Sequence, residues 1–254
     1  FEADEEIYMK AAELYMDIED YQRVAKITGK AIQLEDKLIQ AYKWNMKAHI
    51  QLEQYGKALE SSNTLLELEK NGMNHYWRGY IYDKQGNFKK AEKDLRKAID
   101  LSSGELDFYI VLSDVLYKME KYDQALTICE KGLNLDNKNK RLLKTRSLVY
   151  HAQLEYPKAI NDLSKILLFS PKDEQVFFTR GKYYLEFNQN MNALSDFSKV
   201  IKLDPDNAEA YYLRGKAHEE VTNYKKAADD YEKFMELAGN DSLARARVNK
   251  VKGK

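Results

Sequence analysis

Three similar segments decide how this chain folds: "HYWRGYIYDK" at 75–84, "FTRGKYYLEF" at 178–187 and "YLRGKAHEEV" at 212–221. Each contains an Arg-Gly pair, and the three pairs stand at 78–79, 180–181 and 214–215. The pairs are separated by 102 and 34 residues, and 102 is three times 34. A fixed spacing of this length indicates a chain built from repeated structural units.

Alignment at a 34-residue period gives columns that hold one kind of side chain. We number the positions in each repeat from 1 to 34, with the glycine of Arg-Gly at position 8. Position 20 is alanine in every repeat after the first, and position 17 is aromatic except at Asn190. Position 8 is small except for Met46, and the column reads Ala12, Met46, Gly79, Ser113, Ser147, Gly181 and Gly215. Small residues at 8 and 20 predict two helices that pack closely, because larger side chains would overfill the contact.

Helix breakers are scarce, and the few that occur agree with this period. The chain has three prolines and 11 glycines in 254 residues, and its apolar residues recur at intervals of three and four. Pro157 falls at position 18, in the first turn of a second helix, where its missing N–H is tolerated. Pro171 and Pro205 fall at position 32, after a second helix ends. Each repeat is therefore predicted to be a pair of helices joined at positions 15–17.

These columns resemble the tetratricopeptide repeat (TPR) family, which has a 34-residue period and small, aromatic and alanine residues at fixed places. The resemblance extends over seven repeats and almost the whole chain. It implies an all-α fold, a right-handed α-solenoid (superhelix) of seven helical hairpins, with first helices lining a concave groove. The predicted repeats are 5–38, 39–71, 72–105, 106–139, 140–173, 174–207 and 208–241, with the seven-repeat domain at 1–241 and a capping segment at 242–254.

The recurrent arginine at position 7 covaries with an aspartate at position 23. Position 7 reads Ala11, Asn45, Arg78, Leu112, Arg146, Arg180 and Arg214, and position 23 reads Ile27, Ser61, Asp94, Ile128, Asp162, Asp196 and Asp230. Arginine occurs where aspartate occurs and nowhere else. In the fourth repeat both columns are apolar, so pairs between neighbouring repeats would leave Asp94 and Arg146 alone. We therefore predict four ion pairs, each within one repeat, and prefer this structural explanation to a row of arginines that binds phosphate or nucleic acid.

Binding residues are expected on the first helices of the repeats, since the family's groove is lined by positions 2, 5, 6, 9, 12 and 13. Both tryptophans of the chain stand at position 6, in adjacent repeats, among tyrosines and lysines. Aromatic rings and arginine are typical anchors of protein interfaces. The predicted groove residues are Lys43, Trp44, Lys47, Tyr76, Trp77, Tyr80, Tyr117, Arg141, Lys144, Lys182 and Lys216, with His151, Phe178 and Tyr212 nearby. The alternative for Tyr76, Phe178 and Tyr212, and also for the two tryptophans, is that they pack between neighbouring first helices.

The composition excludes several other classes of function. Lys+Arg and Asp+Glu both number 41, so a net charge of zero argues against general binding to nucleic acid or anionic membranes. One cysteine, Cys129, excludes a disulfide framework and falls in a core column. No histidines have metal-ligand spacing, and we expect no catalytic site, metal or cofactor. No membrane insertion is expected. The chain starts at Phe1, so we expect a processed chain or a segment in a soluble compartment: cytoplasm, or periplasm after removal of a signal.

The function that these features favour is a scaffold that binds a peptide or protein segment and helps assemble a complex. A chaperone carboxylate clamp is not expected, because no repeat has lysine at position 5 with asparagine at position 9. The alternative is that the repeats recruit substrates for a larger enzyme or signalling protein. RNA binding of the pentatricopeptide type fits poorly, since those repeats are one residue longer.

The C-terminal stretch 242–254 is predicted to be a capping helix over the last repeat. Terminal repeats need a cover with a polar outer face. The stretch is basic, and its apolar residues are Leu243, Ala246, Val248 and Val251. Acidic residues gather instead at the N-terminus, around Glu2 to Asp20, and both charge runs are expected to be solvated surface.

Overall fold

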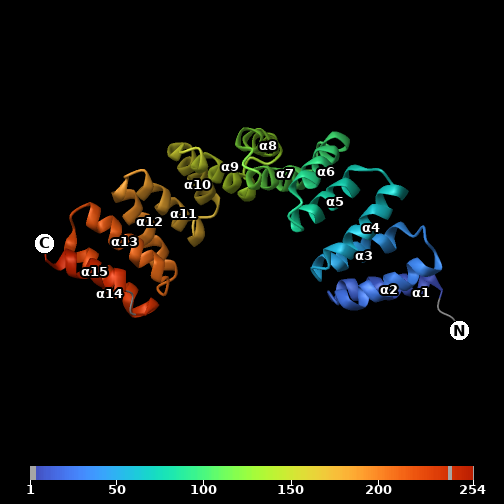
Figure 1. Cartoon of the computed structure of the whole chain (residues 1–254), viewed down its shortest axis with the longest axis horizontal. Coiled ribbons are helices and arrows are strands. Elements are labelled where there is room, and N and C mark those ends of the chain that lie inside the picture. The colour runs from blue at the N-terminus through green and yellow to red at the C-terminus, as the bar shows by residue number, and fades with distance from the viewer. Residues whose placement is uncertain (1–3, 240–241, 254) are drawn as a thin grey trace. The chain divides into compact units, whose positions relative to one another are not determined.

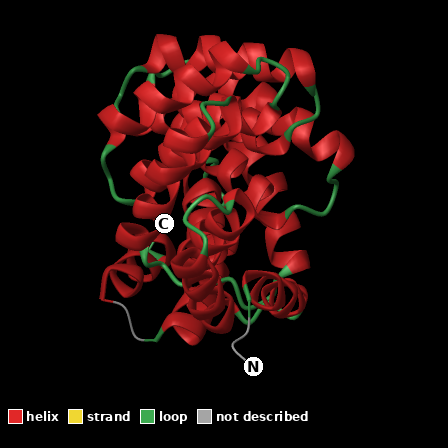
Figure 2. Cartoon of the chain, turned by 90° about the vertical axis from the view of Figure 1, so that its right-hand side faces the viewer, coloured by secondary structure: helices red, strands yellow, loops and turns green. Residues whose placement is uncertain are grey.

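The structure is a computed structural model that describes residues 4–239 and 242–253. These residues form fifteen helices and no strand, which confirms the all-α prediction (Figure 1 and Figure 2). The helices are α1 (Glu5–Asp17), α2 (Tyr21–Leu34), α3 (Ile39–Gln51), α4 (Tyr55–Leu68), α5 (Gly72–Lys84), α6 (Phe88–Leu101), α7 (Leu106–Lys118), α8 (Tyr122–Leu135), α9 (Lys140–Ala152), α10 (Tyr156–Phe169), α11 (Glu174–Glu186), α12 (Asn190–Leu203), α13 (Ala208–Glu220), α14 (Tyr224–Ala238) and α15 (Ser242–Lys252).

The helices pack as hairpins within two units. The first unit contains α1–α8 and ends at Leu135, and the second begins at Asp136 and contains α9–α15. Inside each unit an odd-numbered helix packs against the even-numbered helix that follows it, and that second helix packs against the first helix of the next hairpin (Figure 1). Each hairpin core is therefore shared with its neighbour in the unit, as expected for a repeat protein.

Local capping explains where many of these helices begin. A short polar side chain stands just before seven of them and accepts a hydrogen bond from a backbone N–H of the first turn, which would otherwise have no partner. The capping residues are Asp4, Asp20, Asn71, Asn139, Asp173, Asn207 and Asn223.

The turn inside every hairpin requires a left-handed backbone at repeat position 15. Gly86 has φ of 73° there, and six residues other than glycine adopt φ between 56° and 61° at the same place. These six are Glu19, Glu53, Glu120, Leu154, Asn188 and Thr222. Glycine and asparagine tolerate this conformation, but a β-branched residue such as Thr222 is strained in it. The tight turn thus imposes one backbone conformation whatever the side chain.

The close contact inside each hairpin joins position 8 to the side chain at position 24, as well as to the backbone of position 20. A Cβ added to Gly79 would lie 2.8 Å from Leu95 and 3.3 Å from the carbonyl oxygen of Ala91. Added to Gly181, it would lie 2.8 Å from the ring of Phe197. The predicted close contact of positions 8 and 20 is confirmed, and the side chain at position 24 adds a second limit on the size of the residue at position 8.

Met46 follows the same rule. It is the one large residue at position 8, and position 24 of its repeat holds Ser62 in place of a leucine or an aromatic residue. Both Met46 and Ser62 are buried. A large side chain on one helix thus faces a small one on the other, so the hairpin keeps its packing volume.

The C-terminal helix α15 covers the last hairpin, as predicted. Val248 and Val251 are buried in a cluster with Ala227, Ala228 and Tyr231 of α14. Ala246, which we had assigned to the apolar face, is exposed, and the side chain of Leu243 lies outside the described residues.

An acidic side chain of α13 holds α15 in place. Glu219 accepts hydrogen bonds from Tyr231 Oη at 3.0 Å, Arg247 Nη1 at 3.0 Å and Lys250 Nζ at 2.6 Å. Burial opposes ionisation of Glu219, but the hydrogen bonds from Lys250 and Tyr231 and the charge of Arg247 outweigh it and lower its pKa. The ionised carboxylate therefore joins three helices.

Candidate interaction surface

The four arginine–aspartate pairs form within single hairpins, as the covariation predicted. In each pair the arginine Nε donates to one carboxylate oxygen and Nη2 to the other, at 2.7–2.9 Å. The pairs are Arg78–Asp94, Arg146–Asp162, Arg180–Asp196 and Arg214–Asp230. In the second repeat, where both positions hold neutral residues, a hydrogen bond from Ser61 to Asn45 at 2.8 Å takes the place of the ion pair. All four arginines thus form ion pairs inside the protein, which agrees with the structural explanation of the arginine column.

The arginines also contact the preceding hairpin, which the sequence analysis missed. The third guanidinium nitrogen, Nη1, donates from Arg78 to Asn63, from Arg180 to Ser164 and from Arg214 to Ser198, at 2.8–3.2 Å. All three acceptors stand at position 25 of the preceding repeat. That column, had it been compared with position 7, could have revealed the contact. The arginine side chain therefore joins neighbouring repeats as well as the two helices of its own repeat.

An aromatic cluster with basic neighbours lies on α3 and α5. The ring centroids of Tyr76 and Trp77 lie 5.2 Å apart, and those of Trp77 and Tyr80 lie 5.9 Å apart. Lys47 Nζ stands 5.7 Å from the centre of the Trp77 ring, and Lys84 Nζ stands 5.2 Å from that of Tyr80. An ammonium over an aromatic face is an attractive arrangement. The structure thus brings together four of the predicted residues and adds Lys84, which occupies position 13.

Members of this cluster differ in how much of the side chain is accessible to a binding partner. Tyr76 is only 8% exposed and stacks on Phe108 of α7 at 5.0 Å, so it packs between first helices, as the alternative prediction held. Trp77 is half-buried against the core that includes Met46 and Ile81. Tyr80 is also half-buried, and Lys47 is exposed. The accessible part of the cluster consists of the outer faces of Trp77 and Tyr80 with their lysines.

The other predicted residues of the first unit stand apart from the cluster. Trp44 is half-buried and makes no ring contact with another aromatic residue in the described part of the chain. Lys43 Nζ lies 3.8 Å from a carboxylate oxygen of Glu69. Tyr117 lies 6.2 Å, centroid to centroid, from Tyr122 of its own hairpin. The two tryptophans therefore do not stack on one another.

In the second unit several predicted residues pack against their own neighbours. Phe178 meets the ring of Phe197 at 6.0 Å, and Tyr212 lies 5.2 Å from Phe234. Arg247 of the capping helix stands over Tyr212 at 5.9 Å. The ring contacts of Phe178 and Tyr212 are thus with the second helix of their own hairpin and, for Tyr212, also with α15. The alternative prediction had placed these contacts between neighbouring first helices.

The charged predicted residues of this unit reach the next hairpin or solvent. Lys144 Nζ donates to Gln175 Oε1 at 2.9 Å, and Lys182 Nζ lies 3.8 Å from Glu209. Arg141 is exposed and Lys216 is half-buried. These contacts link successive first helices but do not assemble one cluster.

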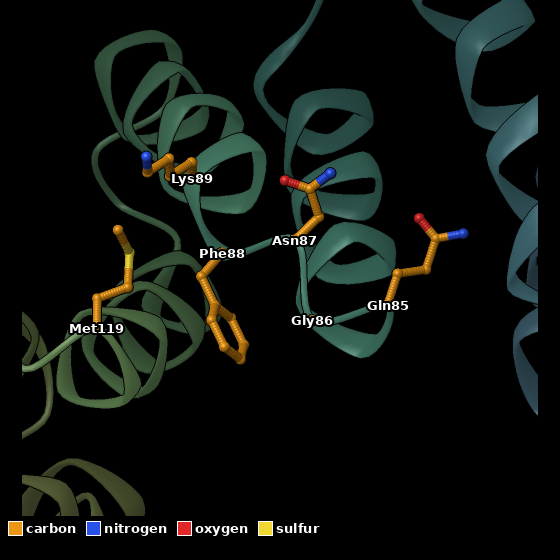
Figure 3. A pocket seen from close by; sticks show the side chains of 6 residues that line it. All are labelled: Gln85, Gly86, Asn87, Phe88, Lys89 and Met119. Atoms are coloured by element: carbon orange, nitrogen blue, oxygen red, sulfur yellow. The ribbon is translucent and has the colours of Figure 1, made fainter.

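The described residues contain no arrangement that resembles a catalytic centre. Cys129 is fully buried, and no group of three His, Cys, Asp or Glu side chains within 4–239 and 242–253 could hold a metal ion. A surface hollow of about 620 Å³ lies beside the turn between α5 and α6, near the end of α7. Figure 3 shows Phe88, Lys89 and Met119 on one side of that turn and Gln85 on the other. The residues that line the hollow include no acid–base pair. None of the helices of the described chain is both long and apolar enough for a membrane span.

Comparison with known proteins identifies the repeat. The family pattern described as "Tetratricopeptide repeat" matches residues 75–104, 106–139 and 208–241, and the pattern "TPR repeat" matches 181–221. A TPR repeat-containing protein, MJ1428 of Methanocaldococcus jannaschii, is 32% identical over 83 residues. That match covers 33% of this chain and only 15% of that protein.

Solved structures show the same fold at low identity. A tetratricopeptide repeat protein from Parabacteroides merdae has a TM-score of 0.70 and 17% identity, and the match covers 98% of both chains. The C-terminal part of a TPR repeat-containing protein from Cytophaga hutchinsonii has a TM-score of 0.79 and 17% identity, with 94% of this chain and 98% of that chain covered. The hetero-tetramer Cut9–Hcn1 gives a TM-score of 0.64 at 11% identity over 96% of this chain and 48% of that chain. With its periodic columns, its hairpins and these family-pattern matches, the chain is built from tetratricopeptide repeats.

Proposed function

We propose that this protein is an interaction scaffold that binds a peptide or protein segment on the surface of α3 and α5 and so helps to assemble a protein complex. Its family and its fold are typical of non-catalytic interaction scaffolds. Fold alone does not name a function, so the residues of this surface carry the proposal.

The observation that carries the proposal is the pairing of aromatic faces with lysines. Trp77 and Tyr80 are half-buried, so part of each ring stays in contact with water, and Lys47 and Lys84 stand beside them. None of these four residues is needed for the arginine–aspartate pairs that hold the hairpins together. Rings that are rigidly held lose little freedom on binding, and they are frequent anchors of interfaces. Lysines beside them favour a partner segment that carries carboxylates next to an apolar side chain.

The test is a pull-down with the whole chain as bait, followed by identification of the retained proteins. The variant Trp44→Ala/Trp77→Ala should lose the partner while its helical circular dichroism stays close to that of the wild type. Trp77 contacts the core of the hairpin, so a second variant, Lys47→Glu/Lys84→Glu, changes only exposed side chains and leaves packing intact. Phe169→Ala, at the end of α10, serves as the control. Equal retention by all four proteins would remove this surface from the proposal.

A further inference from the structure

The turn between α5 and α6 differs in its chemistry from the other six hairpin turns. Repeat positions 13–20 hold at least one acidic residue in every other repeat, whereas residues 84–91 read "KQGNFKKA" and carry three lysines and no acid. Position 15 is glycine in this repeat alone, at Gly86. The hairpin lies between two others of the first unit, because α4 packs on α5 and α7 packs on α6. Both features therefore belong to the interior of the repeat array.

Gly86 adds no side chain to the space beside this turn. A Cβ added there would meet no atom within 4 Å other than those of its chain neighbours, and the glycine lines the hollow of about 620 Å³ (Figure 3). Phe88 and Met119, both half-buried, give the hollow its apolar lining. In the second unit the same two positions hold Tyr156 and Phe187, whose rings stack at 5.8 Å. Met119 has no ring to stack on Phe88, and a flexible methionine adapts to an apolar group of another molecule.

The three lysines of the turn have no carboxylate partner. Lys84, Lys89 and Lys90 are exposed, and none of them makes an ion pair within residues 4–239 and 242–253. Lys84 Nζ and Lys90 Nζ stand 5.2 and 5.3 Å from the ring centres of Tyr80 and Tyr82. Ammonium groups without a counter-charge attract acidic groups of a partner. The turn thus combines an apolar hollow with an excess of positive charge.

The α7 side of the hollow carries no such excess. Lys118 Nζ donates to Asp83 Oδ1 at 2.7 Å and stands 5.5 Å from the centre of the Phe88 ring. Glu120, next to Met119, is exposed. One face of the Phe88 ring is therefore already covered by an ammonium group of the protein, which disfavours the stacking of a nucleic-acid base on it.

The shape of the hollow favours a peptide segment over a small molecule. The hollow is open to solvent, whereas sites for small molecules enclose most of their ligand. A segment that crosses the turn can place one apolar side chain against Phe88 and Met119. Its carboxylates then lie beside the lysines of the turn, and the amide side chains of Gln85 and Asn87 line the hollow next to its backbone.

We propose that this hollow binds an acidic segment of a partner protein, which inserts one apolar side chain. The lining residues are Gln85, Gly86, Asn87, Phe88, Lys89 and Met119. The other turns are poor sites for the same segment, because each carries at least one acidic residue that repels it. The hollow is distinct from the aromatic surface of α3 and α5, and its role does not depend on that surface.

One NMR titration follows the two sites separately. The isotope-labelled whole chain is titrated with the blocked peptide Gly-Glu-Glu-Leu-Glu-Glu-Gly. The backbone amide of Gly86 reports on the hollow, and the indole N–H groups of Trp44 and Trp77 report on the aromatic surface. We expect the shift of the Gly86 amide to saturate with a Kd below about 1 mM. Because the indole shifts are read independently, failure at the hollow leaves the proposed function of the aromatic surface intact.

Two control peptides test the chemistry of the hollow. Alanine in place of the leucine should weaken binding at Gly86 about fivefold, because the apolar anchor is lost. Lysine in place of every glutamate should abolish the saturable shift, because like charges then meet at the turn. Raising the salt from about 0.05 to about 0.5 M should weaken binding of the acidic peptide.

Variants of the protein place the peptide at the turn. Gly86→Glu introduces the residue that the first, second and fourth repeats carry at position 15, so the fold accommodates it. This variant should bind the acidic peptide about tenfold more weakly, measured at the Met119 amide. Gly104→Glu is the matched control, because it adds the same charge at an equally open glycine beyond the other end of α6, and it should bind as the wild type does.

Four results would overturn the proposal. The first is a Gly86 amide that shows no saturable shift by about 1 mM peptide. The second is equal binding of the leucine and alanine peptides, or of Gly86→Glu and Gly104→Glu. In the third, single-stranded oligothymidylate shifts the Gly86 amide more strongly than the peptide does, which would assign the hollow to nucleic acid. In the fourth, the wild type self-associates in sedimentation and Gly86→Glu abolishes this, which would assign it to a second copy of the chain.

Discussion

Arg180 holds Asp196 through two hydrogen bonds of 2.8 Å each, and its remaining terminal nitrogen donates to Ser164 Oγ at the same distance. One side chain therefore joins α10, α11 and α12. Burial of Asp196 opposes its ionisation more strongly than Arg180 favours it, so the pKa of this carboxyl is raised. The pair is thus a specific link whose desolvation cost offsets much of its attraction.

Replacing only the arginine should be costly. Arg180→Leu leaves the Asp196 carboxylate buried without its partner, and we expect the free energy of unfolding to fall by about 3–5 kcal/mol. Urea unfolding followed by circular dichroism measures the change. A loss below about 1 kcal/mol would contradict the structural role assigned to the pair.

Replacing both partners should cost much less. The double variant Arg180→Leu/Asp196→Ile reproduces Leu112 and Ile128, which occupy the same two positions in the fourth repeat. Ser164 still donates to the carbonyl oxygen of Ile160 at 2.7 Å, so its hydroxyl keeps a partner. We expect the double variant to recover most of the stability that the single variant loses. A double variant as unstable as the single one would show that the attraction between Arg180 and Asp196 exceeds the cost of removing both charges from water.

Two glycine-to-alanine substitutions should change the free energy of unfolding in opposite directions. A Cβ at position 181 would lie 2.8 Å from the Phe197 ring, so Gly181→Ala should lower the free energy of unfolding by about 1–3 kcal/mol. Nothing lies within 4 Å of a Cβ added to Gly29 in α2, so Gly29→Ala should raise it by about 0.5–1 kcal/mol through helix propensity. Thermal unfolding of the two variants in parallel gives the comparison, and shifts of equal sign would refute the packing argument.

The strained turn before α14 should accept glycine with a gain in stability. Thr222 has φ of 60°, which is unfavourable for a β-branched residue, whereas Gly86 stands at the equivalent turn of the third repeat with φ of 73°. We expect Thr222→Gly to raise the free energy of unfolding by about 1 kcal/mol. Gly86→Ala is the reciprocal control and should lower it. If Thr222→Gly is destabilising, the left-handed turn is not a source of strain.

Acid should loosen the capping helix α15. The folded-state pKa of Glu219 is lower than its value of 4.5 in an unstructured chain, so its contribution to stability is present above that pH and is lost as the pH falls through the lower, folded-state pKa. Glu219→Gln cannot form the charged hydrogen bonds to Arg247 and Lys250, and local opening of α15 should become easier by about 1–3 kcal/mol. Hydrogen exchange of the α15 amides measures this opening. Glu232→Gln is the control, because its carboxylate is exposed and, within the described residues, bonds Lys252 alone. Exchange in Glu219→Gln that stays as slow, and as dependent on pH, as in the wild type would exclude this role.

Much of the secondary structure was predictable because it follows from local chemistry. The period of 34 residues placed Ala91 and Gly79 on facing helices, and the covariation of Arg78 with Asp94 was visible inside a single chain. Repeats make this possible, because the same pair of positions can be compared in seven hairpins that carry different side chains. The capping residues Asp20 and Asn207 acted within their own turn, where no distant contact can override them.

Which residues remain accessible depended on packing across hairpins. Tyr76 and Trp77 are neighbours in sequence, yet Tyr76 is covered by Phe108 of the next hairpin while Trp77 keeps part of its ring in water. In the same way, the large Met46 is an exception at position 8, and its repeat holds the small, buried Ser62 at position 24. The sequence by itself determined where the helices begin and which charges pair, because hairpin formation is local. Only the tertiary structure decided what each side chain meets across the helix contact, because burial and volume depend on neighbours from another helix.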